Sequence, residues 1–598
     1  METSDSNSSH NLTWLRSVAD MVTCFIMAVM LLRGFVLEGY LISTGSMAPH
    51  LRGFHKRIVC PSCGHIFAFG ISFDESVSVS DMTATRSDGS EKTAVCPNCG
   101  QANIDVSAVP NSHGDQLLVQ KHVYDFRRPK RWETIVFRNP AAPEEAYVKR
   151  VTGLPGESLQ VIDGDIYING TIARKPWPVL QEMRIPVCEL NHLVDSEDWQ
   201  MPWEADVGWD VAGGRLQTMD LSDDLSSAPA TVSSDDPPET MQWITFRYWL
   251  WSGGDHFSET PLSPQSAGGE WEHAIRRFSS VPVSWISRLD YDRDREVLRC
   301  EGVMPQGIQQ DLLNHADNAE FRNAIFRLAA RSHLAPVTDQ YGYNALISAR
   351  HYRVRDLSLH AVLGWHEAPA MIQVDVPCEG ELFQVRLMPE KQLIELYSVD
   401  HDLVLESTTF ETRTVPPAPG DTHAENLAGV ELDASAIDGQ VVVAVNGNAC
   451  FEPFIPRQSN DSGRILPSNL DERLAPSIRA SQDALLVEQQ QQWRLGVTGA
   501  GVQVVDLQMY RDVYYTPGRE RNGIREPYPI PRDCYFVQGD NSPVSSDSRS
   551  WGDPCVPHRL LVGKPFVVHL PSRPAILQLG SRDILIRIPD WKRIRYIH

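Results

Sequence analysis

The sequence predicts a mainly β protein built from several parts, and three observations support this. Short runs that alternate polar and apolar residues, or that are rich in β-branched residues, recur between Gly, Pro and Asp turns. One apolar run lies near the N-terminus, and two CxxC pairs follow it. A chain of 598 residues is too long for one compact core. We therefore expect an N-terminal helix followed by two to four mainly β domains.

Composition limits the class of protein. Hydrophobic residues make up 42% of the chain, which excludes a wholly disordered protein. The formal net charge is -23, and a protein that neutralises phosphates needs a basic face instead. The charge therefore argues against a nucleic-acid partner.

The apolar run predicts a single transmembrane helix over residues 17–37, preceded by a cytoplasmic tail over 1–16. Met21 to Leu32 carry no charge, and Arg33 is the first interruption. With snorkelling at both ends, the run approaches the twenty residues or so that a bilayer requires. A cleaved signal peptide and a buried helix of a soluble domain are the alternatives, although the segment has no clear cleavage site.

The flanking and middle regions are both strand-rich. GESLQVIDGDIYING predicts a hairpin with Asp163-Gly164 as its turn. The middle block, 176–500, is large enough to be a domain, and its strand-rich pattern suggests a β-sandwich. Within it we expect a helix near Asn318 to Ser332 and an acidic linker over 218–240.

The cysteines form two groups. CPSCGH and CPNCGQ each place two thiolates on a tight turn, and together they predict a four-sulfur zinc site made by Cys60, Cys63, Cys96 and Cys99. No ligand position is left open, so this zinc is expected to be structural; disulfides or a redox CxxC are the alternatives. Six scattered cysteines could form three disulfides or remain buried thiols.

A candidate nucleophile, Ser46, lies in LISTGSMAPHL, just past the apolar run. A serine hydroxyl needs a nearby base, and His or a desolvated Lys could supply it. None of the 19 histidines has a recognisable catalytic context. Lys149, between Val148 and Val151 in a strand-like run, is the lysine candidate, although an exposed strand lysine would look the same.

Four sequence blocks resolve this ambiguity through a resemblance. GSMAPHL, GDQLLVQKHVYDFRRP, YVKRVTGLPGESLQVIDGDIYING and YFVQGDNSPVSSDSRSWG occur in this order. They resemble the motifs of the type I signal peptidases, membrane-anchored Ser-Lys proteases that remove signal peptides from exported proteins. The long insertions and the zinc ribbon are similar to the enlarged, planctomycete-type members of that family.

The resemblance implies a role for each matching residue. Ser46 matches the nucleophile, Lys149 the general base, and Thr44 the hydroxyl that stabilises the oxyanion together with the Ser46 N–H. Ser545 matches the serine that hydrogen-bonds the lysine. The remaining matches are supporting residues: Arg150, Gly539, Asp540, Asn541, Asp547 and Arg549. The chain departs from the family pattern at Ser43, Thr44, Trp132-Glu133 and Glu157.

The resemblance also implies an organisation and a location. The catalytic domain would comprise 38–56, 113–175 and 501–598, interrupted by a zinc ribbon over 57–112 and by the 176–500 insertion. Residues 353–454 resemble, faintly, a laminin-G or concanavalin-like sandwich. We expect a single-pass protein of the bacterial cytoplasmic membrane with its catalytic part extracytoplasmic. Its partners would be preprotein signal peptides, membrane lipid and the secretion translocon, and it would use no catalytic cofactor.

Two other functions are compatible with these patterns. A self-cleaving repressor-type peptidase shares the Ser-Lys chemistry, but the expected anchor and the lack of a DNA-binding module argue against it. An inactive, membrane-tethered binding protein would instead use the inserted sandwich.

Overall fold

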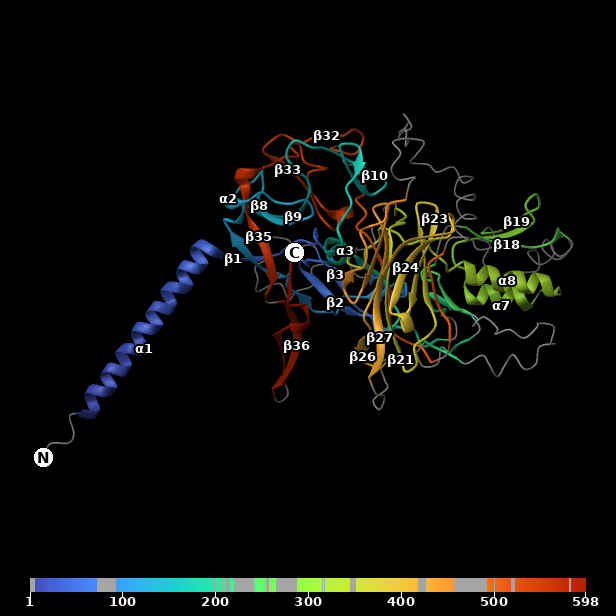
Figure 1. Ribbon diagram of the computed structural model, residues 1–598, viewed down its shortest axis with the longest axis horizontal. Helices are drawn as coiled ribbons and strands as arrows, with labels where there is room; N and C mark the ends of the chain where they lie inside the picture. Colours follow the sequence, from blue (N-terminus) through green and yellow to red (C-terminus); the bar gives the residue numbers. More distant parts are fainter. Residues whose placement is uncertain are drawn as a thin grey trace.

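The structure is a computed structural model, and it is mainly β, as predicted (Figure 1). It describes residues 6–71, 93–196, 199–206, 208–210, 216–219, 241–253, 257–264, 288–314, 316, 318–344, 351–417, 426–456, 492–499, 501–517, 522–569, 571–579 and 582–597. Nearly all of the expected acidic linker, 220–240, lies outside these residues.

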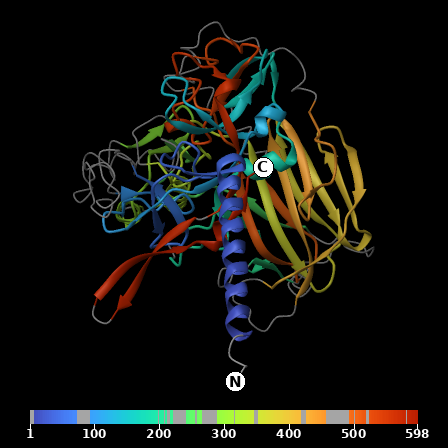
Figure 2. The same ribbon diagram turned by 90° about the vertical axis from the view of Figure 1, so that its left-hand side faces the viewer.

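The N-terminal segment is helical but differs from the expected anchor. α1 (Ser6–Leu31) passes into a π-helical turn, η1 (Leu32–Val36), and β1 begins at Leu37, so the helix ends before 37. Within the described chain, no helix is both long and apolar enough to cross a bilayer. α1 extends away from the β-rich body in Figure 1, and in Figure 2, which faces that side, it lies in front of the body.

An eight-stranded sheet gathers segments from both ends of the chain. Its order is β1-β7-β35-β8-β9-β33-β34, with β38 paired to β35. These strands are β1 (Leu37–Leu41), β7 (Gln116–Lys121), β8 (Thr134–Arg138), β9 (Ala146–Gly153), β33 (Cys534–Gln538), β34 (Val556–Pro557), β35 (Leu561–Val568) and β38 (Arg595–Tyr596). We call this the catalytic sheet, because the candidate residues lie on it and on the turns that follow it.

The predicted hairpin is present beside the catalytic sheet. β10 (Ser158–Ile162) pairs with β11 (Asp165–Ile168), and Asp163 and Gly164 both have positive φ, as a tight two-residue hairpin turn requires. Two short strands, β12 (Thr171–Ile172) and β32 (Tyr528–Pro529), complete this four-stranded sheet.

The cysteine knuckles form a ribbon of short strands. The first knuckle joins β2 (His55–Val59) to β3 (Ile66–Gly70), and the second joins β4 (Thr93–Ala94) to β5 (Ile104–Asp105). β6 (Asn111–Ser112) pairs with β2. All four cysteines are buried among the apolar side chains of this ribbon.

Two large sheets pack face to face in the middle region. The nine-stranded sheet contains β13 (Ile185–Glu189), β15 (Trp209–Asp210), β16 (Leu216–Thr218), β21 (Leu357–Trp365), β26 (Arg413–Val415), β27 (Leu427–Ile437), β28 (Gln440–Val445), β29 (Asn448–Ala449) and β31 (Gln503–Arg511). The seven-stranded sheet contains β14 (Trp203–Ala205), β17 (Gln242–Phe246), β22 (Ile372–Cys378), β23 (Glu381–Met388), β24 (Leu393–Ser398), β25 (Leu403–Thr409) and β30 (Arg494–Val497).

Side chains of both sheets share one apolar core, and burial alternates along β23 as expected for a strand with one face inward. β31 lies in the range that we expected to belong to the last catalytic segment, yet it pairs with β21 of this sandwich. The sandwich therefore takes strands from 185 to 511.

Smaller elements complete the described chain. β18 (Phe257–Pro261), β19 (Leu289–Asp292) and β20 (Val297–Glu301) pack with α7 (Gln306–Asn314) and α8 (Ala319–Arg331), the latter at the predicted helix. α2 (Val123–Phe126) follows β7, and α3 (Trp177–Met183) packs on the sandwich. β36 (Ser572–Leu579) and β37 (Arg582–Pro589) form a hairpin.

The six scattered cysteines divide in a way that the sequence left open. Cys534 and Cys555 form a disulfide beside β33 and β34. Cys188, Cys300, Cys378 and Cys450 remain free thiols.

Candidate active site

Ser46 lies on a turn that follows the edge strand β1 of the catalytic sheet. β1 pairs with β7, and this pairing fixes where the chain leaves the sheet, five residues before Ser46. Ser46 is half-buried. The hydroxyl of the exposed Thr44 donates to Ser46 Oγ, with 3.4 Å between the two oxygens.

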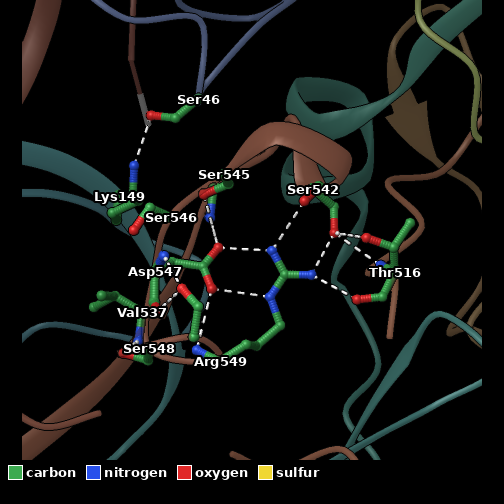
Figure 3. A network of polar contacts seen from close by, with 12 residues as sticks. Ser46, Lys149, Thr516, Val537, Ser542, Ser545, Ser546, Asp547, Ser548 and Arg549 are labelled. Carbon is green, nitrogen blue, oxygen red and sulfur yellow. Dashed lines mark hydrogen bonds and ion pairs between the residues drawn. The ribbon is translucent and has the colours of Figure 1, made fainter. Parts of the chain in front are cut away.

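Lys149 approaches Ser46 from β9, which three strands separate from β1 in the same sheet. It lies on β9, and its Nζ donates to Ser46 Oγ at 2.6 Å (Figure 3). The residue is only 4% exposed. Burial lowers the pKa of Lys149 to about 8, and the Asp547 carboxylate opposes this effect only in part. The structure thus joins the two residues that the sequence placed 103 positions apart.

The backbone around Ser46 is held by the Gly539-Asp540-Asn541 turn. The Asn541 N–H donates to the Ser46 carbonyl oxygen at 3.0 Å, and Asn541 Nδ2 donates to the Gly45 carbonyl oxygen at 3.0 Å. A Cβ at Gly539 would lie 2.4 Å from the Ser46 carbonyl oxygen, so a larger residue could not pack there. These contacts fix the nucleophile loop against the turn that follows β33.

Asp547 is the centre of a second buried network (Figure 3). Its carboxylate accepts from Arg549 Nε at 2.9 Å and Nη2 at 2.8 Å, and from the Gly539 N–H at 3.0 Å. Burial alone would raise the pKa of Asp547, but the Arg549 guanidinium holds it below its usual range. Arg549 in turn donates to Ser542 Oγ at 2.6 Å and to the Thr516 carbonyl oxygen at 2.8 Å.

The predicted contact of Ser545 with the lysine differs in the structure. Ser545 Oγ donates to Asp547 Oδ2 at 2.7 Å. In the described structure the hydrogen bond of Lys149 goes to Ser46 rather than to Ser545. Ser545 therefore lies beside the dyad without bridging to the lysine.

The supporting residue Arg150 forms a buried ion pair with Asp540. Arg150 Nε and Nη2 donate to the two oxygens of Asp540 at 2.8 and 2.7 Å, and both side chains are almost fully buried. His50 Nδ1 lies 3.2 Å from the same carboxylate. The bidentate pair joins β9, next to Lys149, to the turn that clamps Ser46.

A short segment of the middle region completes the clamp, although no local sequence pattern pointed to it. Asn344 and Asn541 exchange two amide hydrogen bonds of 2.8 Å each, and the Tyr341 hydroxyl donates to the Asp540 carbonyl oxygen at 2.6 Å. The Tyr343 ring lies so close to Gly45 that a Cβ there would be 2.3 Å from it. The nucleophile loop is thus enclosed by the inserted region.

The four cysteines of the ribbon have the geometry of a metal site. Cys60 Sγ lies 3.6 Å from Cys99 Sγ, and Cys63 Sγ lies 3.7 Å from Cys96 Sγ. A tetrahedral zinc with sulfur ligands at about 2.3 Å would separate the sulfurs by roughly 3.8 Å. The spacing is too long for disulfides and fits a four-thiolate ion site.

Comparisons with known proteins place this site in a family context. The family model described as signal peptidase, peptidase S26, matches residues 102–204 and 438–570. The matched residues include Lys149, Asp540 and Asp547 and leave out Ser46. Among solved structures, a Caenorhabditis elegans galectin covers 26% of this chain and 83% of its own, at 12% identity and a TM-score of 0.16, too distant to bear on the fold.

Several curated relatives share shorter segments. Signal peptidase I of Leptolyngbya laminosa is 45% identical over 64 residues, which cover 9% of this chain and 31% of the relative. Signal peptidase I V of Bacillus subtilis is 34% identical, over 11% of this chain and 37% of the relative. Signal peptidase I of Pseudomonas aeruginosa is 28% identical, over 19% and 48%. The matches span less than half the length of these relatives, and within the shared segments they confirm the predicted resemblance to the type I signal peptidases.

Proposed function

We propose that this chain is a serine endopeptidase that removes N-terminal signal peptides from exported preproteins, with Ser46 as nucleophile and Lys149 as general base. The observation that carries the proposal is the 2.6 Å contact between Lys149 Nζ and Ser46 Oγ, made by a buried lysine. The family-model match over the segments that contain Lys149 and Asp547 supports it, as do the shorter matches to curated signal peptidases.

The chemistry follows from the state of the lysine. With a pKa of about 8, roughly a tenth of the Lys149 side chains are neutral at pH 7. A neutral amine accepts the Ser46 hydroxyl proton as Oγ attacks the scissile carbonyl, and the resulting ammonium protonates the leaving amine. Lys149 then activates water in the same way, and the water hydrolyses the acyl-enzyme. No step needs a metal or an organic cofactor at the reacting atoms.

Thr44 and the Ser46 N–H would stabilise the oxyanion. The Thr44 hydroxyl is exposed and close to Ser46 Oγ, so a substrate carbonyl bound there lies within its reach. Donors that are held in place before the reaction lower the barrier by several kcal/mol in comparable sites. The contacts of Asn541 with the Gly45 and Ser46 carbonyl oxygens would keep the loop in this orientation.

The substrate would be an extended segment with small side chains before the scissile bond. β1 is an edge strand of the catalytic sheet and leads directly to Ser46, so an added substrate strand would reach the nucleophile.

We also propose that the protein acts at the outer side of the bacterial cytoplasmic membrane, close to the secretion translocon. α1 exposes a set of apolar side chains to solvent that lipid would cover: Met21, Val22, Phe25, Ile26, Met27, Val29, Met30 and Leu31. Flotation of the full chain with anionic vesicles tests this, and replacing Phe25 and Met30 by Ser should reduce it. Equal flotation of both proteins would contradict lipid binding through α1.

For the ribbon, we propose a structural zinc ion held by Cys60, Cys63, Cys96 and Cys99. Their sulfur spacing and burial support four-thiolate coordination, and such an ion stabilises a small ribbon that has little core of its own.

The test of the activity is cleavage of a preprotein by the full chain in detergent, combined with labelling by a serine-acylating inhibitor. Wild type should cleave and become labelled, and Ser46→Ala should do neither. Ser158→Ala, a serine on the hairpin away from the site, is the matched control and should behave as wild type. Cleavage by Ser46→Ala would refute the assignment, and a wild type that neither cleaves nor labels would favour the binding-protein alternative.

A further inference from the structure

A second group of metal-ligand side chains lies where the ribbon meets the sandwich. His65 ends the first cysteine knuckle, Glu189 ends β13, and His192 lies in the turn that follows. One ligand atom from each residue lies within 4.8 Å of the others. The three residues come from two separate parts of the fold, and the peptidase mechanism uses none of them.

The distances within this group differ from those of ordinary hydrogen bonds. Glu189 Oε2 lies 3.5 Å from His65 Nδ1 and 3.6 Å from His192 Nε2, whereas N–H···O bonds are about 2.7–3.2 Å long. One tetrahedral ion with nitrogen and oxygen ligands at about 2.0–2.2 Å separates those ligands by roughly 3.3–3.5 Å. The two separations from Glu189 are therefore close to those around one ion, and the ligand atoms of the two imidazoles lie within 4.8 Å of each other.

The donor atoms are also free to bind. His65 Nδ1 is buried and has no hydrogen-bond partner among the described residues, a state that costs free energy unless something binds there. The side chains of Glu189 and His192 are 23% and 32% exposed, so water can reach a fourth position. Two imidazoles and one carboxylate are a ligand set that suits zinc.

Neighbouring contacts hold this group in place. Asn98, in the second knuckle, accepts from the Glu189 N–H at 2.8 Å and donates to the His192 carbonyl oxygen at 2.9 Å. The His65 carbonyl oxygen accepts from the Cys60 N–H at 2.9 Å. The two knuckles thus position all three ligands from the backbone, as the outer contacts of metal sites commonly do.

We propose that His65, Glu189 and His192 bind a second divalent ion of the zinc class, with water as the fourth ligand, and that this ion fastens the ribbon to the sandwich. The inference does not depend on the peptidase activity. It predicts two zinc ions per chain: one on the four thiolates and one on this group.

Metal counting tests the proposal. The full chain is stripped by a chelator under reducing conditions, reloaded with zinc alone, freed of excess metal, and measured by native mass spectrometry and elemental analysis. Wild type should hold two ions, and Glu189→Gln, which keeps the shape of the side chain and the backbone bond to Asn98, should hold one. His122→Ala is the matched control, because His122 pairs with Asp125 on the surface and belongs to no such three-residue group. It should retain two ions.

Loading the protein with cobalt in place of zinc shows which of the two ions a variant has lost. Thiolate-to-cobalt charge transfer reports the four-cysteine site and should be unchanged in Glu189→Gln. If that variant also lost the thiolate signal, His192→Ala, which lies outside the ribbon, would decide the count. One ion in wild type, or two in both Glu189→Gln and His192→Ala, would overturn the proposal.

Discussion

Two buried lysines in this chain have opposite chemistry, although both are almost fully removed from water. Lys149 contacts the neutral Ser46 hydroxyl, and burial lowers its pKa to about 8. Lys175 lies 2.6 Å from Asp438 and 2.7 Å from Asp512. Burial opposes its charge too, but these two carboxylates reverse the effect and raise the pKa of Lys175 well above its usual value.

The two lysines differ in whether the nearest carboxylates already pair with an arginine. Near Lys149, the charge of Asp547 is already engaged by Arg549, and that of Asp540 by Arg150. These carboxylates therefore lie close to Lys149 but do not cancel the lowering of its pKa by burial. Lys175 has no such arginine between it and its acids, so it remains an ammonium that holds the hairpin sheet and the sandwich together.

The largest expected effect separates the two lysines by activity. Lys149→Met should reduce kcat/KM for preprotein cleavage by about 10³-fold or more, because it removes the proposed base. Lys121→Met, on the same sheet and in a partly exposed ion pair with Glu38, is the matched control and should cleave nearly as well as wild type. Comparable cleavage by the Lys149 variant would end the dyad assignment.

For the free energy of unfolding we expect the opposite order: replacing Lys175 should cost more than replacing Lys149. Lys175→Met leaves the buried Asp438 and Asp512 without their cation, and should lower the free energy of unfolding by about 3–5 kcal/mol. Lys149→Met should leave stability nearly unchanged, since a buried amine is replaced by an apolar chain. Urea titrations of both variants measure this, and equal losses would show that the two environments do not differ as described.

The pH dependence of the rate should follow the proton on Lys149. Since the ammonium cannot accept a proton, kcat/KM should rise with pH and level off above about 8. Between pH 8 and pH 6 the rate should fall by about 50-fold, for one proton with that pKa. Cleavage of a substrate without titrating groups near the scissile bond measures the profile, and a flat profile over this range would contradict a lysine base.

The acids around Lys175 should produce a pH effect on stability. Burial and the neighbouring Asp438 and Asp512 raise the pKa of Asp356 to about 8, so the folded chain binds a proton there that the unfolded chain has lost above pH 4. The free energy of unfolding should therefore decrease as pH rises from about 4 to about 8, because the folded chain holds this proton until the higher pH. Asp356→Asn should flatten this decrease in urea titrations at pH 5 and pH 8. A decrease of the same size in the variant would exclude Asp356 as its source.

The smallest effect concerns the clamp from the inserted region. Asn344→Ala removes the two amide bonds to Asn541 and should reduce kcat about 10-fold while costing about 1 kcal/mol of stability. Gln340→Ala, on the same segment, leaves those two bonds intact and serves as the comparison. Unchanged kcat in Asn344→Ala would mean that the clamp does not orient Ser46.

Local sequence patterns predicted the features that depend on residues close together in the chain. Asp163-Gly164 takes the conformation that a tight hairpin turn demands, and the paired CxxC spacing brings four sulfurs together. The motif order pointed to Ser46 and Lys149, and the structure brings these two side chains into contact.

Other features depend on contacts between distant segments, which no local pattern records. Ser545 donates to Asp547, and only the three-dimensional arrangement decides which partners lie within its reach. Asn344 reaches Asn541 across 197 positions from a region outside the motifs. Likewise, nothing in the spacing of six cysteines distinguishes the pair Cys534 and Cys555 from the other combinations.

The separation of the site residues along the chain determines when the site can exist. The contacts that assemble it join positions 103, 390 and 496 residues apart. At ribosomal rates of about 5–20 residues per second, roughly 25–100 s pass between the synthesis of Ser46 and that of Asn541. During that interval a growing chain carries the nucleophile and later the base, but not the turn that holds them. Proteolytic competence would thus appear only after Asn541 has been added, when the molecule can already fold around its own susceptible segments.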